Sequence, residues 1–232
     1  MGNAAAKLEE IELGTGSLQD AKSICKAFVS SKEGVTKIKN KGKTWVSADG
    51  VDETLLWKTT SAGMFKVKSV VEDSSGTQVA TIITAKKGIT SSTVYIGRAV
   101  PSFTGQSPLT EEQLKGSGIA AGTVLYPFSK IEASRKLTTA KCTYGIYTGA
   151  DDVLNLYEGE KLSSLGFKAI FKEISSTDEG GVVVAKAYTP GMSMSPCVDA
   201  AIGVDMLAIV SMGYALAGDD SAAGALAGAG VV

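Results

Sequence analysis

Lysines at alternate positions are the most evident binding feature of this sequence. Lys37, Lys39, Lys41 and Lys43 are each separated by one residue, and Trp45 follows them. On an extended strand, every second side chain points to the same side, so these ammonium groups would share one face. Such a face could bind acidic lipid headgroups or an acidic protein surface. It could equally be the solvated face of an edge strand, where lysine discourages aggregation.

Side chains that support catalysis are scarce. The chain has no histidine, which excludes Ser-His-Asp and Cys-His catalysis and most zinc or iron sites. Cys25, Cys142 and Cys197 are far apart and lack a CxxC spacing, as is typical of reduced thiols in an intracellular protein. Cys197 follows Pro196, and a thiolate would be stabilised there by a helix N-terminus, but a small packed side chain is the more usual role.

Two other motifs could bind a nucleotide or a metal ion, and neither has the right context. Gly116–Gly122 has the glycine spacing of a phosphate-binding loop, but a strand follows it where a helix is required. Asp151 and Asp152 lack the spacing of a calcium-binding loop. We therefore expect no metal, no cofactor and no catalytic residue. An enzyme with an unrecognised site remains an alternative.

Composition limits the class of partner. The chain has 232 residues, is 44% hydrophobic and carries a formal net charge of −1. Its only arginines are Arg98 and Arg135, whereas bidentate phosphate and guanine recognition favours arginine. We therefore expect no binding to nucleic acid. We also expect a cytoplasmic protein, because no secretory signal is visible at the start.

The N-terminal residues suggest a lipid anchor followed by a helix. The start Met1-Gly2-Asn3-Ala4-Ala5-Ala6-Lys7 makes Gly2 a candidate for N-myristoylation, although Ala6 stands where Ser or Thr is usual. An acetylated or unstructured terminus is the alternative. Ser17 resembles a helix cap, and the apolar residues from Leu18 to Phe28 follow helical spacing. This predicts a short amphipathic helix.

The middle of the chain is rich in predicted strands. Alternation of apolar and polar residues predicts a hairpin over Met64–Ile83 and a second one that joins Lys168–Ser175 to Val182–Tyr188. Further strands are expected at Thr93–Val100, Thr123–Glu132 and Ala140–Thr148. Such spacing, without long helices between the strands, favours an antiparallel barrel or sandwich. Pro101–Gly122 interrupts the series as a long excursion.

An apolar segment near the C-terminus predicts the architecture. Ser195 and Pro196 resemble a helix start, and Gly218 is placed to end a helix over about 196–217. The length allows a membrane span, but Asp205 lies within the segment and many residues are Ala or Gly. We favour a helix buried in the protein core.

This layout resembles the tubby C-terminal-like superfamily, which includes LURP-one-related proteins and phospholipid scramblases. The residues that carry the resemblance are the hairpin Gly63–Ile82 and the closing segment Asp199–Val210, and it covers about Lys43 to Gly218. It implies a closed barrel around a central helix and a basic pocket for phosphoinositide headgroups. The basic groups available for such a pocket are Lys37, Lys39, Lys41, Lys66, Lys68, Lys86, Lys87 and Arg98.

Together these features predict a mainly β chain, a closed antiparallel barrel around a buried apolar C-terminal helix, with a short N-terminal amphipathic helix. Its expected organisation is a flexible segment 1–16, one domain 17–218 and an unstructured Ala/Gly tail 219–232. The expected function is non-enzymatic binding of phosphoinositides or other acidic headgroups at a membrane periphery. The alternative is a structural or accessory subunit of a larger assembly.

Overall fold

The computed structural model describes residues 8, 10–16, 23–30, 34–41, 44–47, 55–61, 68–73, 75–86, 90–115, 119–136, 139–162, 167–174, 181–190 and 196–217. Within these ranges the strands are β1 (Val35–Lys41), β2 (Thr44–Ser47), β3 (Leu55–Ser61), β4 (Lys68–Glu72), β5 (Gln78–Lys86), β6 (Ser91–Arg98), β7 (Tyr126–Arg135), β8 (Ala140–Tyr147), β9 (Val153–Lys161), β10 (Lys168–Glu173), β11 (Val182–Tyr188) and β12 (Cys197–Ala201). The helical segments are η2 (Lys26–Phe28), α2 (Glu111–Leu114) and α3 (Met206–Ala217).

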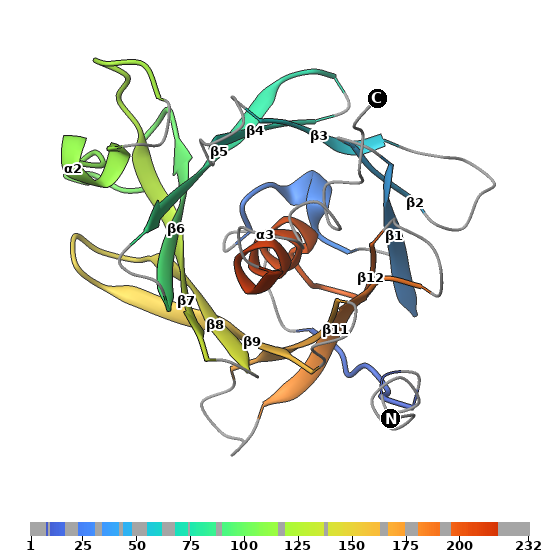
Figure 1. Ribbon diagram of the computed structural model, residues 1–232. Helices are drawn as coiled ribbons and strands as arrows, with labels where there is room; N and C mark the ends of the chain where they lie inside the picture. The colour runs from blue at the N-terminus through green and yellow to red at the C-terminus, as the bar shows by residue number, and fades with distance from the viewer. Residues whose placement is uncertain are drawn as a thin grey trace, which may run out of the picture.

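The strands form one antiparallel sheet in which each strand pairs with its neighbours in sequence. In addition β1 pairs with β12, with Val35 opposite Ala201, so the hydrogen-bonded order returns to its first strand as a closed barrel. Figure 1 shows this ring of strands around α3. The prediction of a mainly β, antiparallel fold with a C-terminal helix is confirmed.

Alternation and turn chemistry explain why the predicted hairpins form. In the first hairpin, the Asp73 carboxylate accepts hydrogen bonds from the backbone N–H groups of Ser75 and Thr77 at 2.9 and 3.0 Å. Gly76 has a φ of 81°, a conformation that glycine adopts without strain. The turn therefore fixes the pairing of β4 with β5. β10 and β11 likewise pair, as predicted for the second hairpin.

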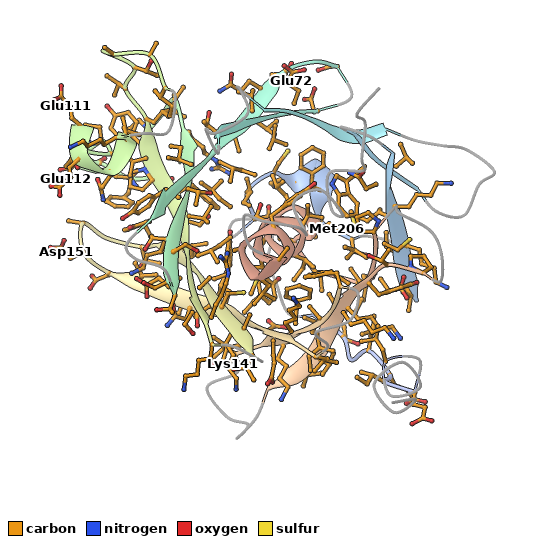
Figure 2. The ribbon with its side chains drawn as sticks, viewed as in Figure 1. Glu72, Glu111, Glu112, Lys141, Asp151 and Met206 are labelled. Carbon is orange, nitrogen blue, oxygen red and sulfur yellow. The ribbon has the colours of Figure 1, made fainter. Side chains whose placement is uncertain are left out.

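The apolar helix α3 lies inside the barrel and supplies much of the core. Ten of its twelve residues are buried, and Leu207, Ala208, Ile209 and Met212 are completely inaccessible. In Figure 2, Met206 lies near the centre, whereas Glu72, Glu111, Glu112 and Asp151 project outward. The choice of a buried helix is confirmed, and none of the described helices is long and apolar enough to cross a bilayer.

The predicted start of this helix was wrong. Ser195 lies outside the described residues, and the segment after Pro196 forms β12, which pairs with both β1 and β11. The reason is a tight turn at Gly203, whose φ is 82°. A Cβ atom at this position would lie only 2.8 Å from the carbonyl oxygen of Gly16, so the turn requires glycine. This turn separates β12 from the helix, which begins only at Met206.

The predicted N-terminal helix is not found among the described residues. Residues 17–22 lie outside them, and Ser23–Ser30 forms a bend followed by the three-residue 3-10 helix η2. This segment enters the barrel beside α3 (Figure 1). Phe28 and Val29 make local i→i−3 bonds to Cys25 and Lys26, whereas Ser30 N–H donates to the Val204 carbonyl at 2.9 Å and accepts at its own carbonyl from Gly203 N–H at 2.7 Å. These partners replace the i→i−4 bonds of an α-helix.

Candidate binding surface and barrel interior

The predicted lysine face exists on the outside of β1. Ile38 and Asn40 are buried, so their neighbours point outward: Lys37 is exposed and Lys39 is half-buried. The cross-strand register places Lys37 opposite Asp199 of β12, which in turn lies opposite Lys186 of β11. The Asp199 carboxylate between these two lysine positions is only 6% exposed, and it accepts a hydrogen bond from the Tyr188 hydroxyl at 3.2 Å.

A segment of the N-terminal region runs along the same side of the barrel. The Lys186 ammonium group donates to the carbonyl oxygens of Leu8 and Ile11 at 3.1 and 3.2 Å. Further along, Gly14 N–H donates to the Val183 carbonyl at 2.9 Å. Leu8 is only 4% exposed. Leu8, Ile11 and Gly14 are thus held against β11, two strands from Lys37.

The structure leaves several predicted site residues without a described side chain. Lys41, Lys68 and Lys86 lie on β1, β4 and β5, but only their backbone is described. Gly2, Lys66 and Lys87 lie outside the described residues. Lys37 and Lys39 are therefore the two predicted lysines that the structure places together.

Arg98 is engaged with the protein's own backbone. Its guanidinium group donates to the carbonyl oxygens of Ser23, at 3.2 Å, and Ile24. It also lies over the ring of Phe128, 3.7 Å from the ring centroid. β6, which carries Arg98, lies across the barrel from β1 (Figure 1). The structure therefore does not bring Arg98 to the lysine face.

The other arginine also stabilises the interior. Arg135 donates to the Ala215 carbonyl at 2.7 Å, near the end of α3. A positive group there complements the negative end of the helix dipole. Both arginines of the chain thus hold backbone carbonyl groups of segments inside the barrel.

Asp205 caps α3 from a completely buried position that the sequence pattern did not identify. Its carboxylate accepts from the N–H groups of Leu207 and Ala208, at 3.0 and 3.1 Å, and from Ile24 N–H at 2.7 Å. Burial raises the pKa of Asp205 to about 6, although these three N–H groups and Arg98 favour the charged form. An aspartate directly before an apolar run is a recognised cap signal, and it could have located the helix start.

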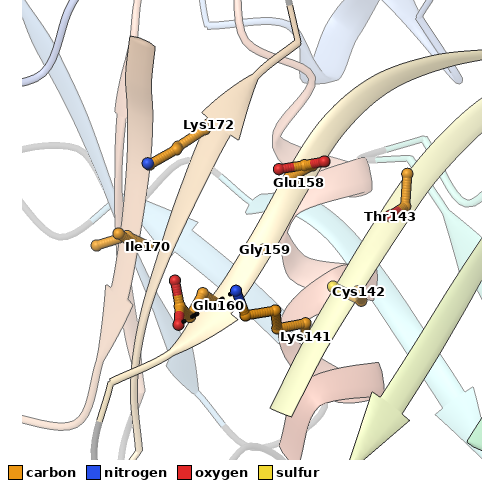
Figure 3. A pocket seen from close by; sticks show the side chains of 8 residues that line it. All are labelled: Lys141, Cys142, Thr143, Glu158, Gly159, Glu160, Ile170 and Lys172. Atoms are coloured by element: carbon orange, nitrogen blue, oxygen red, sulfur yellow. Dashed lines mark ion pairs between the residues drawn. The ribbon is translucent and has the colours of Figure 1, made fainter. Parts of the chain in front are cut away.

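A surface pocket lies on the outer side of β8, β9 and β10 (Figure 3). Lys141 and Glu160 form an ion pair there, with nitrogen and oxygen 3.7 Å apart, and Glu158 lies opposite Lys172. The Cys142 thiol faces the interior, where burial raises its pKa well above the ordinary range, so it is a poor nucleophile. Within the described ranges, no cluster of potential metal ligands is present.

The sequence and the fold were compared with those of known proteins. No family model and no curated protein matches the sequence. A protein of Arabidopsis thaliana known from an X-ray structure is similar at 17% identity, over 80% of this chain and 90% of that chain, with a TM-score of 0.44. A protein of unknown function from Bacteroides fragilis is similar at 11% identity, over 68% of this chain and 94% of that one, with a TM-score of 0.32.

Proposed function

We propose that this chain is a non-enzymatic, tubby-like or LURP-one-like binding domain that attaches to the periphery of anionic membranes and recognises phosphoinositide or similar headgroups. The observation that carries the proposal is the outward pair Lys37 and Lys39 on β1. A cytoplasmic leaflet is negatively charged, and a lysine near its surface contributes about 1 kcal/mol of binding.

The packing of the interior supports an outer binding surface. α3 and Ser23–Ser30 lie inside the ring of strands, and the large side chains Trp45, Tyr144, Tyr157 and Phe171 are buried there. The polar groups at the buried end, Arg98 and Asp205, have partners within the chain. A headgroup would therefore meet outward-facing side chains.

Two or three lysines bind weakly, so the proposal includes a second attachment at Gly2. One myristoyl chain binds a bilayer only with K of about 10⁴ M⁻¹, and stable anchoring takes two signals. Leu8 is held against β11 by Lys186. Six residues span at most about 20 Å, so a lipid on Gly2 would stay within reach of this side of the barrel. Mass spectrometry of native protein would detect the acyl group, and an unmodified Gly2 would remove this part of the proposal.

Vesicle co-sedimentation tests the lysine face. Replacement of Lys37, Lys39 and Lys41 by Glu should weaken binding to phosphoinositide-containing vesicles at least tenfold, because each reversal replaces an attraction with a repulsion. The matched control is Glu at Lys130, Lys141 and Lys172, which lie on the outside of β7, β8 and β10 and change the net charge equally. Equal binding by the wild type and both triple variants would refute the headgroup role.

One observation favours the alternative, a subunit of a larger assembly. Val100 and Val124, at the two ends of the excursion between β6 and β7, are 66% and 53% exposed. The excursion is anchored to the barrel at Leu109, which forms a second small core with Leu125, Ile83 and Tyr95. Co-purification from native extract tests this alternative. A single uncomplexed species would count against it.

A further inference from the structure

The carboxylate of Asp205 joins two segments that are far apart in sequence. It accepts from Ile24 N–H on the segment before η2 and from two N–H groups in the first turn of α3. Val29 also forms an isolated β-bridge with Asp205. The segment Ser23–Ser30, which we call the inner segment, is therefore fastened to the helix start through one ionisable side chain.

Titratable groups from several elements face this junction. Arg98 of β6 donates to the carbonyl groups of Ser23 and Ile24, and the hydroxyl oxygen of Tyr157 of β9 accepts from Asp205 N–H at 3.4 Å. Tyr144 of β8 interacts electrostatically with Asp205 and Arg98, and Cys25 of the inner segment interacts with Arg98. Glu173 of β10 interacts with Tyr157. α3 carries no charged residue. Asp205 and Arg98 are thus the opposite charges at the junction.

The burial of Asp205 makes opening of the junction depend on protons. Asp205 has no exposed surface in the closed state. A carboxyl group that reaches water returns to a pKa of about 4, whereas burial raises it to about 6 when the junction is closed. The closed state consequently binds a proton more tightly than the open state. Proton uptake must favour closure, and proton release must favour opening.

We propose that Asp205 is a proton-controlled latch that fastens the inner segment to the start of α3 and loosens this end of the barrel as the proton is released. This device is independent of the lysine face and of any lipid on Gly2.

Amide hydrogen exchange on the full chain tests the latch. The opening constant reported by the Ile24, Ser30 and Gly203 amides, after correction for intrinsic exchange, should be about tenfold larger at pH 7 than at pH 5. The amides of Val94 and Ile131, in the paired strands β6 and β7, serve as internal controls. An equal change at the control amides would mean global unfolding and would overturn the proposal.

Two further measurements remove the dependence on a single readout. Carbon-13 NMR of the wild-type carboxyl groups should show Asp205 titrating near pH 6, and a midpoint below 4.5 would contradict the latch. In Asp205→Asn, which keeps a capping oxygen but cannot ionise, the opening constant at Ser30 and Gly203 should be the same at both pH values. A tenfold change that persists in this variant would assign the proton to another group.

Discussion

At Gly159 of β9, the packing between neighbouring strands leaves no space for a side chain. A Cβ atom there would lie 2.8 Å from the Cys142 sulfur and 3.0 Å from a ring carbon of Phe171. Both neighbours are buried and belong to the adjacent strands β8 and β10. Glycine at this position is therefore required by close packing, and its backbone conformation is ordinary for a strand.

The variant Gly159→Ala should consequently lower the free energy of unfolding by about 1–3 kcal/mol, the usual cost of overpacking a core. Urea denaturation followed by circular dichroism measures it. Cys142→Ala removes the closest atom, so the double variant Cys142→Ala/Gly159→Ala should be more stable than the sum of the single effects predicts. Strict additivity would contradict the steric explanation.

At the residue level, the sequence predicts outward positions better than interior contacts. Alternation correctly placed Lys37 and Lys39 on one outer face, because a strand imposes a period of two. Arg98 and Asp205 could not be assigned in the same way. Asp205 has a local cap signal, but its bond to Ile24 and the bond from Arg98 to Ile24 span 181 and 74 positions of the chain, and no local pattern encodes those contacts.

At the level of elements, α3 is the feature on which the barrel core depends. Ile209 has no exposed surface and belongs to the main core cluster. Ile209→Ala should cost about 2–5 kcal/mol of stability through lost burial and the cavity that remains. Val124→Ala, at an exposed position, should change stability by less than about 0.5 kcal/mol. Chemical denaturation of both variants checks this, and similar values for the two would contradict a central role for α3.

The elements also show where sequence patterns fail. Hairpins with their own turns were predicted well, since Asp73 and Gly76 specify the turn locally. β12 was missed because Cys197–Ala201 is buried and apolar, apart from Asp199, and a buried strand cannot be distinguished from a buried helix by periodicity. Only its position between β1 and β11 makes it a strand.

For the whole molecule, the regular spacing of strands predicts the antiparallel β class, and one long apolar segment predicts the buried helix. The pairing of β1 with β12 could not be derived from local sequence, since it joins Val35 to Ala201 across most of the chain. That pairing has a consequence for recognition, because it places Asp199 and Lys186 beside the β1 lysines. The charge pattern of the proposed binding face is thus a product of the fold.

NMR mapping with anionic nanodiscs would show whether the outer face of β1 meets the membrane. Addition of phosphoinositide-containing nanodiscs to labelled full-length protein should perturb the amide signals of Val35–Lys41 and Cys197–Ala201. The signals of Lys141–Thr143 and Glu158–Glu160, which line the pocket on β8 and β9, should stay unchanged. Perturbations centred on that pocket, or none at all, would contradict recognition by β1.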